Sequence, residues 1–344
     1  MTGAGDFYRL SGSEQAERLL KLAQDALRHW DGGWRNPRLI KHRENAVFAL
    51  EGEGGARAVL RIHRHAYHDD AALASELQWI GALDAGGIKV PPVIRTRDGG
   101  HFVHVSHALV PEARQVDILG WVPGQPVGSV EDIASQDGAR LTDIYFRAGA
   151  AAAQVHILSA SWPLPDGFRR HAWDRDGLVG PSPFWGRFLD LPLLSPEQRT
   201  LLERAAATAA ADLDRIGTGP DVYGLIHADF VPENLFVHGD EVALIDFDDA
   251  GFGWHMFELA TALFFLQGHE AFPAIADALF EGYEQRRPGK VDRSQLPLFL
   301  FLRGTTYLGW IHTRAEMDAA REQAGFMIDM AVDLAKQYLG QTED

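Results

Sequence analysis

One pattern of polar side chains constrains this chain more than any other feature. Asp229 and Asn234 lie five residues apart, and Asp246 follows after two short apolar runs, Leu235–Val237 and Val242–Ile245. A Gly-Asp pair separates the two runs, which is typical of a tight β-hairpin. A hairpin brings its two ends together, so we expect Asn234 and Asp246 to lie close in space. The fold must therefore present three polar side chains from one loop and the hairpin that follows it.

This set of side chains suits phosphoryl transfer. A polyphosphate donor is heavily charged, and Mg²⁺, which prefers carboxylate, amide and water oxygens, screens that charge. Asn234 and Asp246 supply such oxygens, so the sequence predicts them as metal ligands. Asp229 is then left to accept the proton of an attacking hydroxyl group and to orient that group. We predict Asp229 as the catalytic residue.

The motif around these residues resembles that of a known family. His227-Ala228-Asp229 followed by Asn234 matches the H-R-D-x-x-x-x-N loop of protein kinases, and Ile245-Asp246-Phe247-Asp248 occupies the D-F-G position. The chain resembles the aminoglycoside phosphotransferase and choline-kinase-like family of the protein-kinase-like fold. Within it, the chain is most similar to the group with type II homoserine kinase and the bacterial stress-response kinase. Further segments that follow the family's order are Glu44–Phe48, Val59–Arg64, Ser75–Trp79, Trp121–Gly124 and Ala153–His156.

The resemblance implies an α+β, bilobal protein-kinase-like fold. Residues 1–121 would form a nucleotide-binding N-lobe with an N-terminal helix, a small antiparallel sheet and one further helix. Residues 122–344 would form a mainly helical C-lobe with the catalytic loop, the metal site and the acceptor pocket. The implied reaction transfers the γ-phosphoryl group of ATP, with Mg²⁺, to a hydroxyl group of a small molecule.

The resemblance also assigns nucleotide-binding residues in the N-lobe. Arg61 stands where protein kinases have a phosphate-binding Lys, and Glu76 is its expected partner. Because arginine stays charged and can donate two parallel hydrogen bonds to phosphate oxygens, ATP binding remains feasible. Asn45 in the first-strand segment, with Trp121 and Val122 in the hinge, completes the predicted nucleotide contacts. No G-x-G-x-x-G motif precedes Arg61, which departs from the protein-kinase pattern.

Hydrophobic periodicity predicts a β-rich first third followed by a mostly helical remainder. The segment 161–187 has no clear period and is rich in Pro, Gly, Trp and Arg, so we expect an irregular insertion there. The predicted helices are Ser13–Trp30, Asp69–Leu83, Thr142–Ser159, Ser195–Ile216 and most of the chain after Phe257. The predicted strands are Ala46–Glu51, Ala58–Ile62, Val93–Arg97, His101–His107 and Gln115–Trp121.

Composition excludes several other classes of protein. The formal net charge of −16 argues against a general binder of nucleic acid or anionic membrane, because such binding depends on clustered Lys and Arg. The absence of cysteine removes disulfides, thiolate zinc sites and Cys nucleophiles, and the spacing of the His-rich segments disfavours a histidine zinc site. The N-terminus does not resemble a signal peptide, and the longest apolar runs fall short of the roughly 20 residues that span a bilayer. We therefore expect a cytoplasmic protein whose partner is a small molecule, with neither nucleic acid nor membrane involved.

Two other functions stay open from the sequence. One is a Ser/Thr protein kinase of the stress-response type, although the segment between Asp246 and Phe257 is short for docking a peptide. The other is a nucleotide-binding pseudokinase that acts as a regulator, although Asp229, Asn234 and Asp246 are all retained. The acceptor is undetermined among homoserine, an amino alcohol, a sugar, an aminoglycoside and a protein hydroxyl group. The oligomeric state is undetermined as well.

Several other segments allow two interpretations. His227 and Glu258 fit supporting roles at the catalytic loop better than catalytic ones. The insertion 161–187 forms either a wall of the acceptor site or a packing strap. Polar and aromatic residues in Arg303–Arg314 recur at helical spacing, which fits either a cleft lining or a packed helix face.

Overall fold

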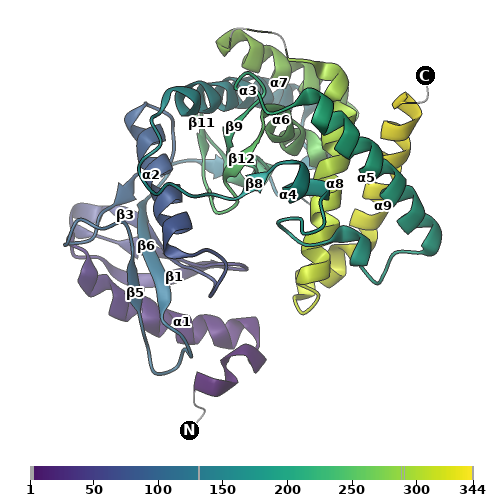
Figure 1. The fold of residues 1–344 in the computed structure, drawn as a ribbon. Helices are drawn as coiled ribbons and strands as arrows, with labels where there is room; N and C mark the ends of the chain where they lie inside the picture. The colour runs from purple at the N-terminus through teal and green to yellow at the C-terminus, as the bar shows by residue number, and fades with distance from the viewer. Residues whose placement is uncertain (1–3, 131, 288, 290, 343–344) are drawn as a thin grey trace. The chain divides into compact units, whose positions relative to one another are not determined.

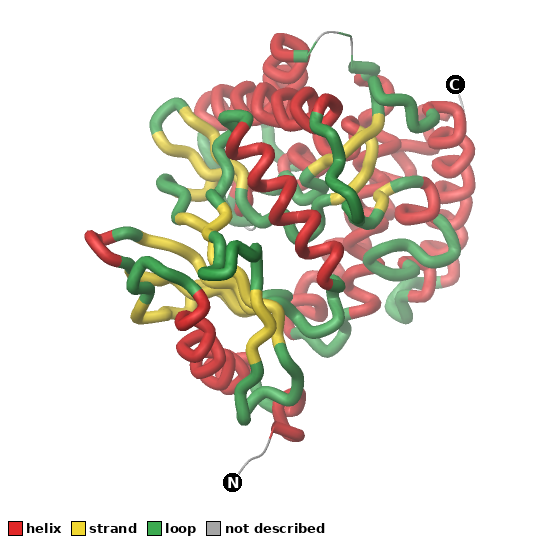
Figure 2. The backbone as a smooth tube through the Cα atoms, turned by 60° about the vertical axis from the view of Figure 1, so that its left-hand side comes forward, coloured by secondary structure: helices red, strands yellow, loops and turns green. Residues whose placement is uncertain are grey.

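The computed structural model describes residues 4–130, 132–287, 289 and 291–342, and the chain divides into two compact units (Figure 1). The first unit ends at Pro123 and also includes Leu164–Arg169. The second comprises Gly124–Pro163 and the chain from Arg170 onward. The first unit is built on an antiparallel sheet, whereas the second is mainly helical (Figure 2). This is the α+β composition that the family resemblance implies.

Within the described residues, a six-stranded sheet forms the first unit. Five strands lie in the order β1-β2-β3-β6-β4, and β5 also pairs with β6. Every pairing in this sheet is antiparallel. The strands are β1 (Arg35–His42), β2 (Ala46–Glu51), β3 (Arg57–Ile62), β4 (Val93–Ile94), β5 (Val103–Val105) and β6 (Arg114–Gly120). Strands β2, β3 and β6 lie within one residue of their predicted positions.

Two helices cover opposite faces of this sheet. Side chains alternate along each strand, so both faces carry residues that the helices can bury. Helix α1 (Gly12–Ala26) shares one buried apolar core with Phe48 and Leu60. Helix α2 (Asp70–Ala85) contacts Arg61, which follows Leu60 on β3 and therefore points to the other face. The apolar core thus lies on the α1 side, and a polar network lies on the α2 side.

Side-chain caps fix where the helices begin. In each case a Ser or Asp oxygen accepts a hydrogen bond from a backbone N–H in the first helical turn. The capping residues are Ser11, Asp69, Asp137 and Ser195, before α1, α2, α3 (Gly138–Ser161) and α5 (Pro196–Ile216). The predicted helices therefore exist, and their ends shift by no more than about four residues, the usual uncertainty of such boundaries.

The strand predictions err where pairing does not follow the hydrophobic pattern. Strand β1 was not predicted, because most of its side chains are exposed and it contains Pro37. It is an edge strand, held to β2 by backbone pairing with two register irregularities. The predicted strands Val93–Arg97 and His101–His107 were too long. A turn lies between them, in which the Thr96 N–H donates to the Gly100 carbonyl. Of these two segments, only the short strands β4 and β5 pair with β6.

The second unit joins helices to two small sheets. Its described elements include α4 (Arg175–Val179), α6 (His255–Leu263), α7 (Phe272–Arg286), α8 (Leu296–Thr313) and α9 (Asp318–Thr342). The sheets have the orders β11-β10-β7 and β8-β12-β9. Their strands are β7 (Gln125–Pro126), β8 (Ala172–Trp173), β9 (Tyr223–Ile226), β10 (Leu235–His238), β11 (Glu241–Leu244) and β12 (Gly251–Trp254).

The predicted hairpin is confirmed, since Leu235 of β10 pairs with Leu244 of β11 in an antiparallel register. The segment 161–187, expected to be irregular, contains the short elements β8 and α4. None of the helices searched in the described part of the chain has both the length and the hydropathy needed to cross a membrane.

Helices α3 and α7 approach so closely that two positions have no room for a side chain. A Cβ atom at Gly149 of α3 would overlap the carbonyl oxygen of Leu279, and one at Gly282 of α7 would overlap that of Phe146. Because backbone atoms block both positions, a larger residue would force the helices apart. By contrast, Gly325 of α9 has no heavy atom within 4 Å of its would-be Cβ.

We expect Gly149→Ala and Gly282→Ala each to lower the free energy of unfolding by about 3 kcal/mol, the upper end of overpacking effects. Gly325→Ala is the matched control and should raise it by about 0.5–1 kcal/mol, because alanine favours the helix. Denaturant-induced unfolding followed by circular dichroism measures all three. Equal effects at the three positions would contradict the close α3–α7 packing.

Candidate active site

The predicted catalytic loop follows β9, and a buried carboxylate fixes its first two peptides. Glu258 of α6 accepts hydrogen bonds from the backbone N–H groups of His227 (2.8 Å) and Ala228 (2.7 Å). Burial raises the pKa of Glu258, although His227 and the two N–H donors oppose the rise. Ala228 has a φ of +64°, a left-handed conformation that is costly for a residue with a Cβ atom. Glu258 therefore holds a strained turn directly before Asp229.

The imidazole of His227 links the catalytic loop to the loop that carries Asp246. Its Nε2 atom lies 2.9 Å from the carbonyl oxygen of Ile245, and its Nδ1 atom accepts a hydrogen bond from the Asp229 N–H (3.3 Å). These partners assign the imidazole proton to Nε2. Both ring nitrogens therefore contact backbone groups, which agrees with the supporting role expected for this residue.

Asp229 and Asn234, predicted as catalytic residue and metal ligand, contact each other directly. The Asn234 Nδ2 atom donates to the Asp229 carboxylate (2.7 Å) and to the Asp229 carbonyl oxygen (3.0 Å). Because the amide nitrogen makes both bonds, the amide oxygen is the Asn234 atom suited to binding a cation. Asn234 is buried, whereas the Asp229 side chain keeps 21% of its surface exposed. The arrangement thus separates a cation-binding oxygen from an accessible carboxylate.

Asp246 lies two residues beyond β11, and its side chain is exposed. Its φ is +66°, so Asp246 itself adopts a left-handed conformation, as Ala228 does next to Asp229. The Ile245 N–H donates to the carbonyl oxygen of Asn234 (3.1 Å), so the structure ties the two predicted metal-binding loops together. The amide and carboxylate oxygens of Asn234 and Asp246 are the kinds of ligand that Mg²⁺ prefers.

Arg303, a buried arginine of α8, also contacts Asp229. Its Nη2 atom donates to Asp229 Oδ1 (2.7 Å) and to the Tyr307 hydroxyl group (2.8 Å), and its Nη1 atom donates to the Ala228 carbonyl oxygen (3.2 Å). Burial opposes the charged form, but Tyr307 and Asp229 outweigh it and hold the pKa of Arg303 above its ordinary value. From the sequence, Arg303 was only one of several polar and aromatic residues that recur at helical spacing in Arg303–Arg314. The sequence feature that sets Arg303 apart is that no other Asp, Glu, Lys or Arg occurs in Leu296–Thr313.

The part of the predicted insertion from Arg170 onward packs against the loop after Asp246. Arg170 donates to three backbone carbonyl groups of residues 247–250, two at 2.5 Å and one at 3.4 Å, and Trp173 Nε1 donates to the fourth (2.9 Å). Trp185 Nε1 donates to the Asp249 carboxylate (3.1 Å). These contacts are those of a packing strap, which was one of the two interpretations open for this segment.

In the first unit, Arg61 lies at the centre of a buried charge network. Its Nη1 atom donates to Glu76 (2.9 Å), which is the predicted pair. Its Nε and Nη2 atoms form two parallel hydrogen bonds with Asp117 of β6, both 2.9 Å long. His63 Nε2 lies 2.6 Å from the same carboxylate. Burial alone would raise the pKa of Asp117, but Arg61 and His63 lower it to about 2.

Asp117 is a member of this network that the sequence did not single out. It lies within the apolar run Gln115–Trp121, where an acidic residue on a buried strand signals a charged partner. Arg61 is only 5% exposed and is held by two carboxylates. Its guanidinium group therefore has a fixed orientation, which a lone surface pair would not impose.

The other predicted nucleotide-binding residues make local contacts. Asn45 accepts a hydrogen bond from the Arg64 N–H (3.1 Å) through its side-chain oxygen. The Arg57 guanidinium carbon lies 3.5 Å from the centre of the Trp121 ring. Val122 is half-buried and lies next to the end of the first unit. The contacts of Asn45 and Trp121 give these two residues a structural role beside the predicted one.

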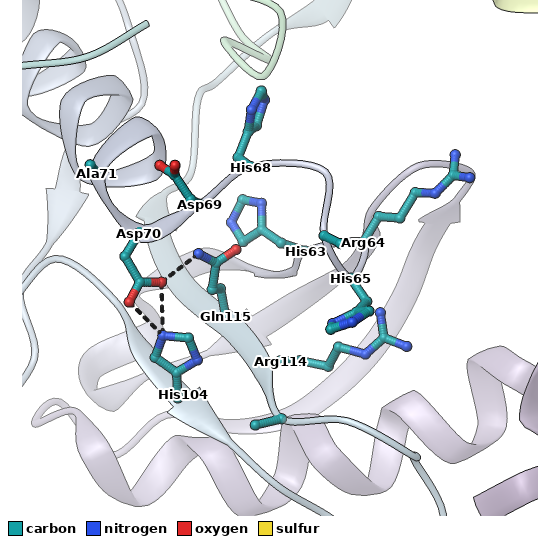
Figure 3. A pocket seen from close by; sticks show the side chains of 12 residues that line it. His63, Arg64, His65, His68, Asp69, Asp70, Ala71, His104, Arg114 and Gln115 are labelled. Carbon is teal, nitrogen blue, oxygen red and sulfur yellow. Dashed lines mark hydrogen bonds and ion pairs between the residues drawn. The ribbon is translucent and has the colours of Figure 1, made fainter. Parts of the chain in front are cut away.

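A hollow of about 510 Å³ opens beside this network, where β3 ends and α2 begins (Figure 3). The imidazole groups of His63, His65 and His68 point in different directions there. The Asp70 carboxylate is bound by His104 (2.9 Å) and Gln115 (2.7 Å). Throughout the described part of the chain, no group of three or more His, Asp or Glu side chains is arranged to hold a metal ion.

The fold has counterparts among solved structures. A microcompartment-associated aminopropanol kinase has a TM-score of 0.81 and 31% sequence identity, covering 94% of this chain and 98% of that chain. An amicoumacin kinase solved with AMP-PNP and Ca²⁺ has a TM-score of 0.72 and 19% identity, covering 95% of this chain and 96% of that chain. The second likeness, at its low identity, supports the fold alone.

Sequence relatives and a family match also point to kinases and phosphotransferases. Amicoumacin kinase of Bacillus subtilis (strain 168) is 23% identical over 85% of this chain and 86% of the relative. Homoserine kinase of Gluconobacter oxydans (strain 621H) is 32% identical over 160 residues, which are 40% of this chain and 48% of the relative. The match to the phosphotransferase enzyme family, APH, spans residues 36–294 and so includes the catalytic loop and the hairpin. With most of its length in that match, the chain belongs to the phosphotransferase enzyme family.

Proposed function

We propose that this chain is an ATP-dependent kinase that transfers the γ-phosphoryl group to a hydroxyl group of a small molecule. The observation that carries the proposal is the direct contact between Asp229 and Asn234, with the Asp246 loop bonded to the backbone of Asn234. Phosphoryl transfer needs one group that orients the attacking hydroxyl and oxygen ligands that hold Mg²⁺. This small set of side chains supplies both.

Asp229 would accept the proton of the attacking hydroxyl group. Because phosphoryl transfer passes through a loose transition state, the position of this carboxylate matters more than its strength as a base. The contacts with Asn234 and Arg303 fix its direction, and its exposed fraction leaves it accessible to an acceptor. The proposed reaction breaks the bond between the γ-phosphorus and the bridging oxygen and forms a phosphate ester, with ADP as the leaving group.

Asn234 and Asp246 would hold Mg²⁺ through the amide oxygen and the carboxylate. When bound, the ion neutralises charge on the ATP phosphates. The residues fit this ion because the Asn234 amide nitrogen is engaged by Asp229, which leaves the amide oxygen as the donor atom. The amicoumacin kinase structure with AMP-PNP and Ca²⁺ supports a nucleotide with a divalent cation in proteins of this fold.

In the first unit, Arg61 would bind the phosphates of ATP, with Glu76 and Asp117 as its supports. The two carboxylates hold the guanidinium group in one orientation. Asn45, Trp121 and Val122 remain our proposed nucleotide contacts. Trp121 and Val122 follow β6, where backbone groups rather than side chains would face the adenine.

We propose an amino alcohol as the acceptor. The likeness to the aminopropanol kinase, at 31% identity over nearly the whole chain, supports this class above homoserine, a sugar or an aminoglycoside. The loop after Asp246 supports a small acceptor over a protein. Only residues 247–250 separate Asp246 from β12, and Arg170 and Trp173 bind their backbone, so no long segment is available to dock a peptide.

A panel of acceptors tests this function. ADP release is coupled to a dye while the protein is supplied with ATP, Mg²⁺ and aminopropanol, ethanolamine, choline, homoserine, an aminoglycoside, a sugar or a casein substrate. We expect the largest kcat/KM with a short amino alcohol. Preference for the casein substrate would favour the protein-kinase alternative, and nucleotide binding without turnover on any acceptor would favour the pseudokinase alternative.

Asp229→Asn should lower kcat by about 10²–10⁴-fold, because it removes the group that accepts and orients the hydroxyl proton. The affinity for ATP should stay within about twofold. Asp240→Asn is the matched control, because its carboxylate lies exposed on the turn of the same hairpin. Stopped assays of ADP release and calorimetric ATP titrations measure both quantities. An Asp229→Asn enzyme with wild-type turnover would contradict the proposed function.

Asp246→Asn should raise the Mg²⁺ concentration needed for half-maximal activity by at least about 10-fold, since even indirect supports of metal ligands matter this much. Chelation of divalent cations should abolish turnover in the unaltered enzyme. The Mg²⁺ dependence of ADP release measures the shift, with Asp240→Asn again as control. Identical Mg²⁺ curves for Asp246→Asn and the control would rule out Asp246 as a ligand.

A further inference from the structure

Arg303 is a charged residue in a place that normally excludes charge. It lies in the middle of α8 and is 0% exposed. Burying an ionised side chain is strongly unfavourable unless good partners compensate it. An aliphatic residue would fill the same space without that cost, so the arrangement calls for a role that only the guanidinium group can perform.

The partners of Arg303 belong to the catalytic loop or are aromatic side chains that pack against the guanidinium group. Two of its nitrogens reach Asp229 Oδ1 (2.7 Å) and the Ala228 carbonyl oxygen (3.2 Å). The guanidinium carbon lies 4.5 Å from the centre of the Tyr307 ring and 5.0 Å from that of Trp185. The rings restrict the guanidinium plane, so its fork points at one carboxylate oxygen and one carbonyl oxygen.

The Ala228 peptide shows what this fork holds in place. Ala228 is in a left-handed conformation, which persists only where the surroundings over-determine it. Glu258 binds its N–H from one side, and Arg303 binds its carbonyl oxygen from the other. We call this pair of contacts the Ala228 clamp. The next residue is Asp229, so the clamp sets the direction in which that carboxylate leaves the backbone.

We propose that Arg303 is a positioning residue for the proposed reaction, acting through Asp229. Arg303 holds Oδ1 of the carboxylate and Asn234 holds Oδ2, so the plane of the carboxylate is fixed before an acceptor arrives. A lysine would keep the charge but has no planar fork for two oxygens. The inference rests on the proposed function, since it assigns Arg303 to the same transfer step.

A double-mutant cycle tests this inference. Arg303→Met should lower kcat by about 100-fold, the effect of misplacing a reacting group by about 1 Å, while KM for ATP changes less than about threefold. Arg303→Lys should keep only part of the turnover. In an Asp229→Asn background, Arg303→Met should lower the residual kcat by less than about threefold, because the carboxylate it positions is absent.

Arg293→Met is the control, because it also removes an ion-paired arginine. Arg293 lies just before the N-terminal end of α8. This substitution should leave kcat unchanged. If Arg303→Met does not fold, as thermal unfolding will reveal, Arg303→Lys carries the same cycle. Equal losses in the two backgrounds would overturn the inference and show a general structural role. Wild-type turnover in Asp229→Asn alone would instead overturn the proposed function, so the two failures are distinguishable.

Discussion

The Ala228 clamp is the interaction on which the catalytic loop depends. A left-handed alanine costs on the order of 1–3 kcal/mol, and nothing in its own side chain repays that cost. The compensation comes from two buried polar side chains on separate helices, Glu258 on α6 and Arg303 on α8. Because these helices also form the apolar interior of the second unit, the packing of the helical region and the direction of Asp229 are set together.

In the first unit, buried polar contacts likewise hold a predicted site residue, Arg61 on strand β3, in one orientation. Arg61 is held by Glu76 and by both oxygens of Asp117, and His63 contacts the same Asp117 carboxylate. A lysine has no planar fork with which to bind Asp117 through two parallel bonds. The Arg in place of the usual kinase Lys and the acidic residue on β6 therefore belong together. Breaking one partner of such a buried pair typically costs about 3–5 kcal/mol, so either change alone would be severe.

The sequence predicted the features that depend on local spacing. The hairpin after Asn234 and strands β2 and β3 all follow from residues close together in the chain. It did not predict Arg303 or Asp117 as partners, because their contacts with Asp229 and Arg61 span 74 and 56 residues. Strand β1 was missed for another reason: backbone pairing at a sheet edge leaves no hydrophobic pattern.

We propose that the chain moves the γ-phosphoryl group of ATP to the hydroxyl group of an amino alcohol. Mass spectrometry of the products formed from γ-¹⁸O-labelled ATP and aminopropanol is the decisive test of this transfer. We expect an O-phosphorylated amino alcohol that carries the labelled oxygens, formed in equal amounts with ADP. Labelled inorganic phosphate as the sole phosphorylated product, or no reaction of ATP with any amino alcohol, would contradict it.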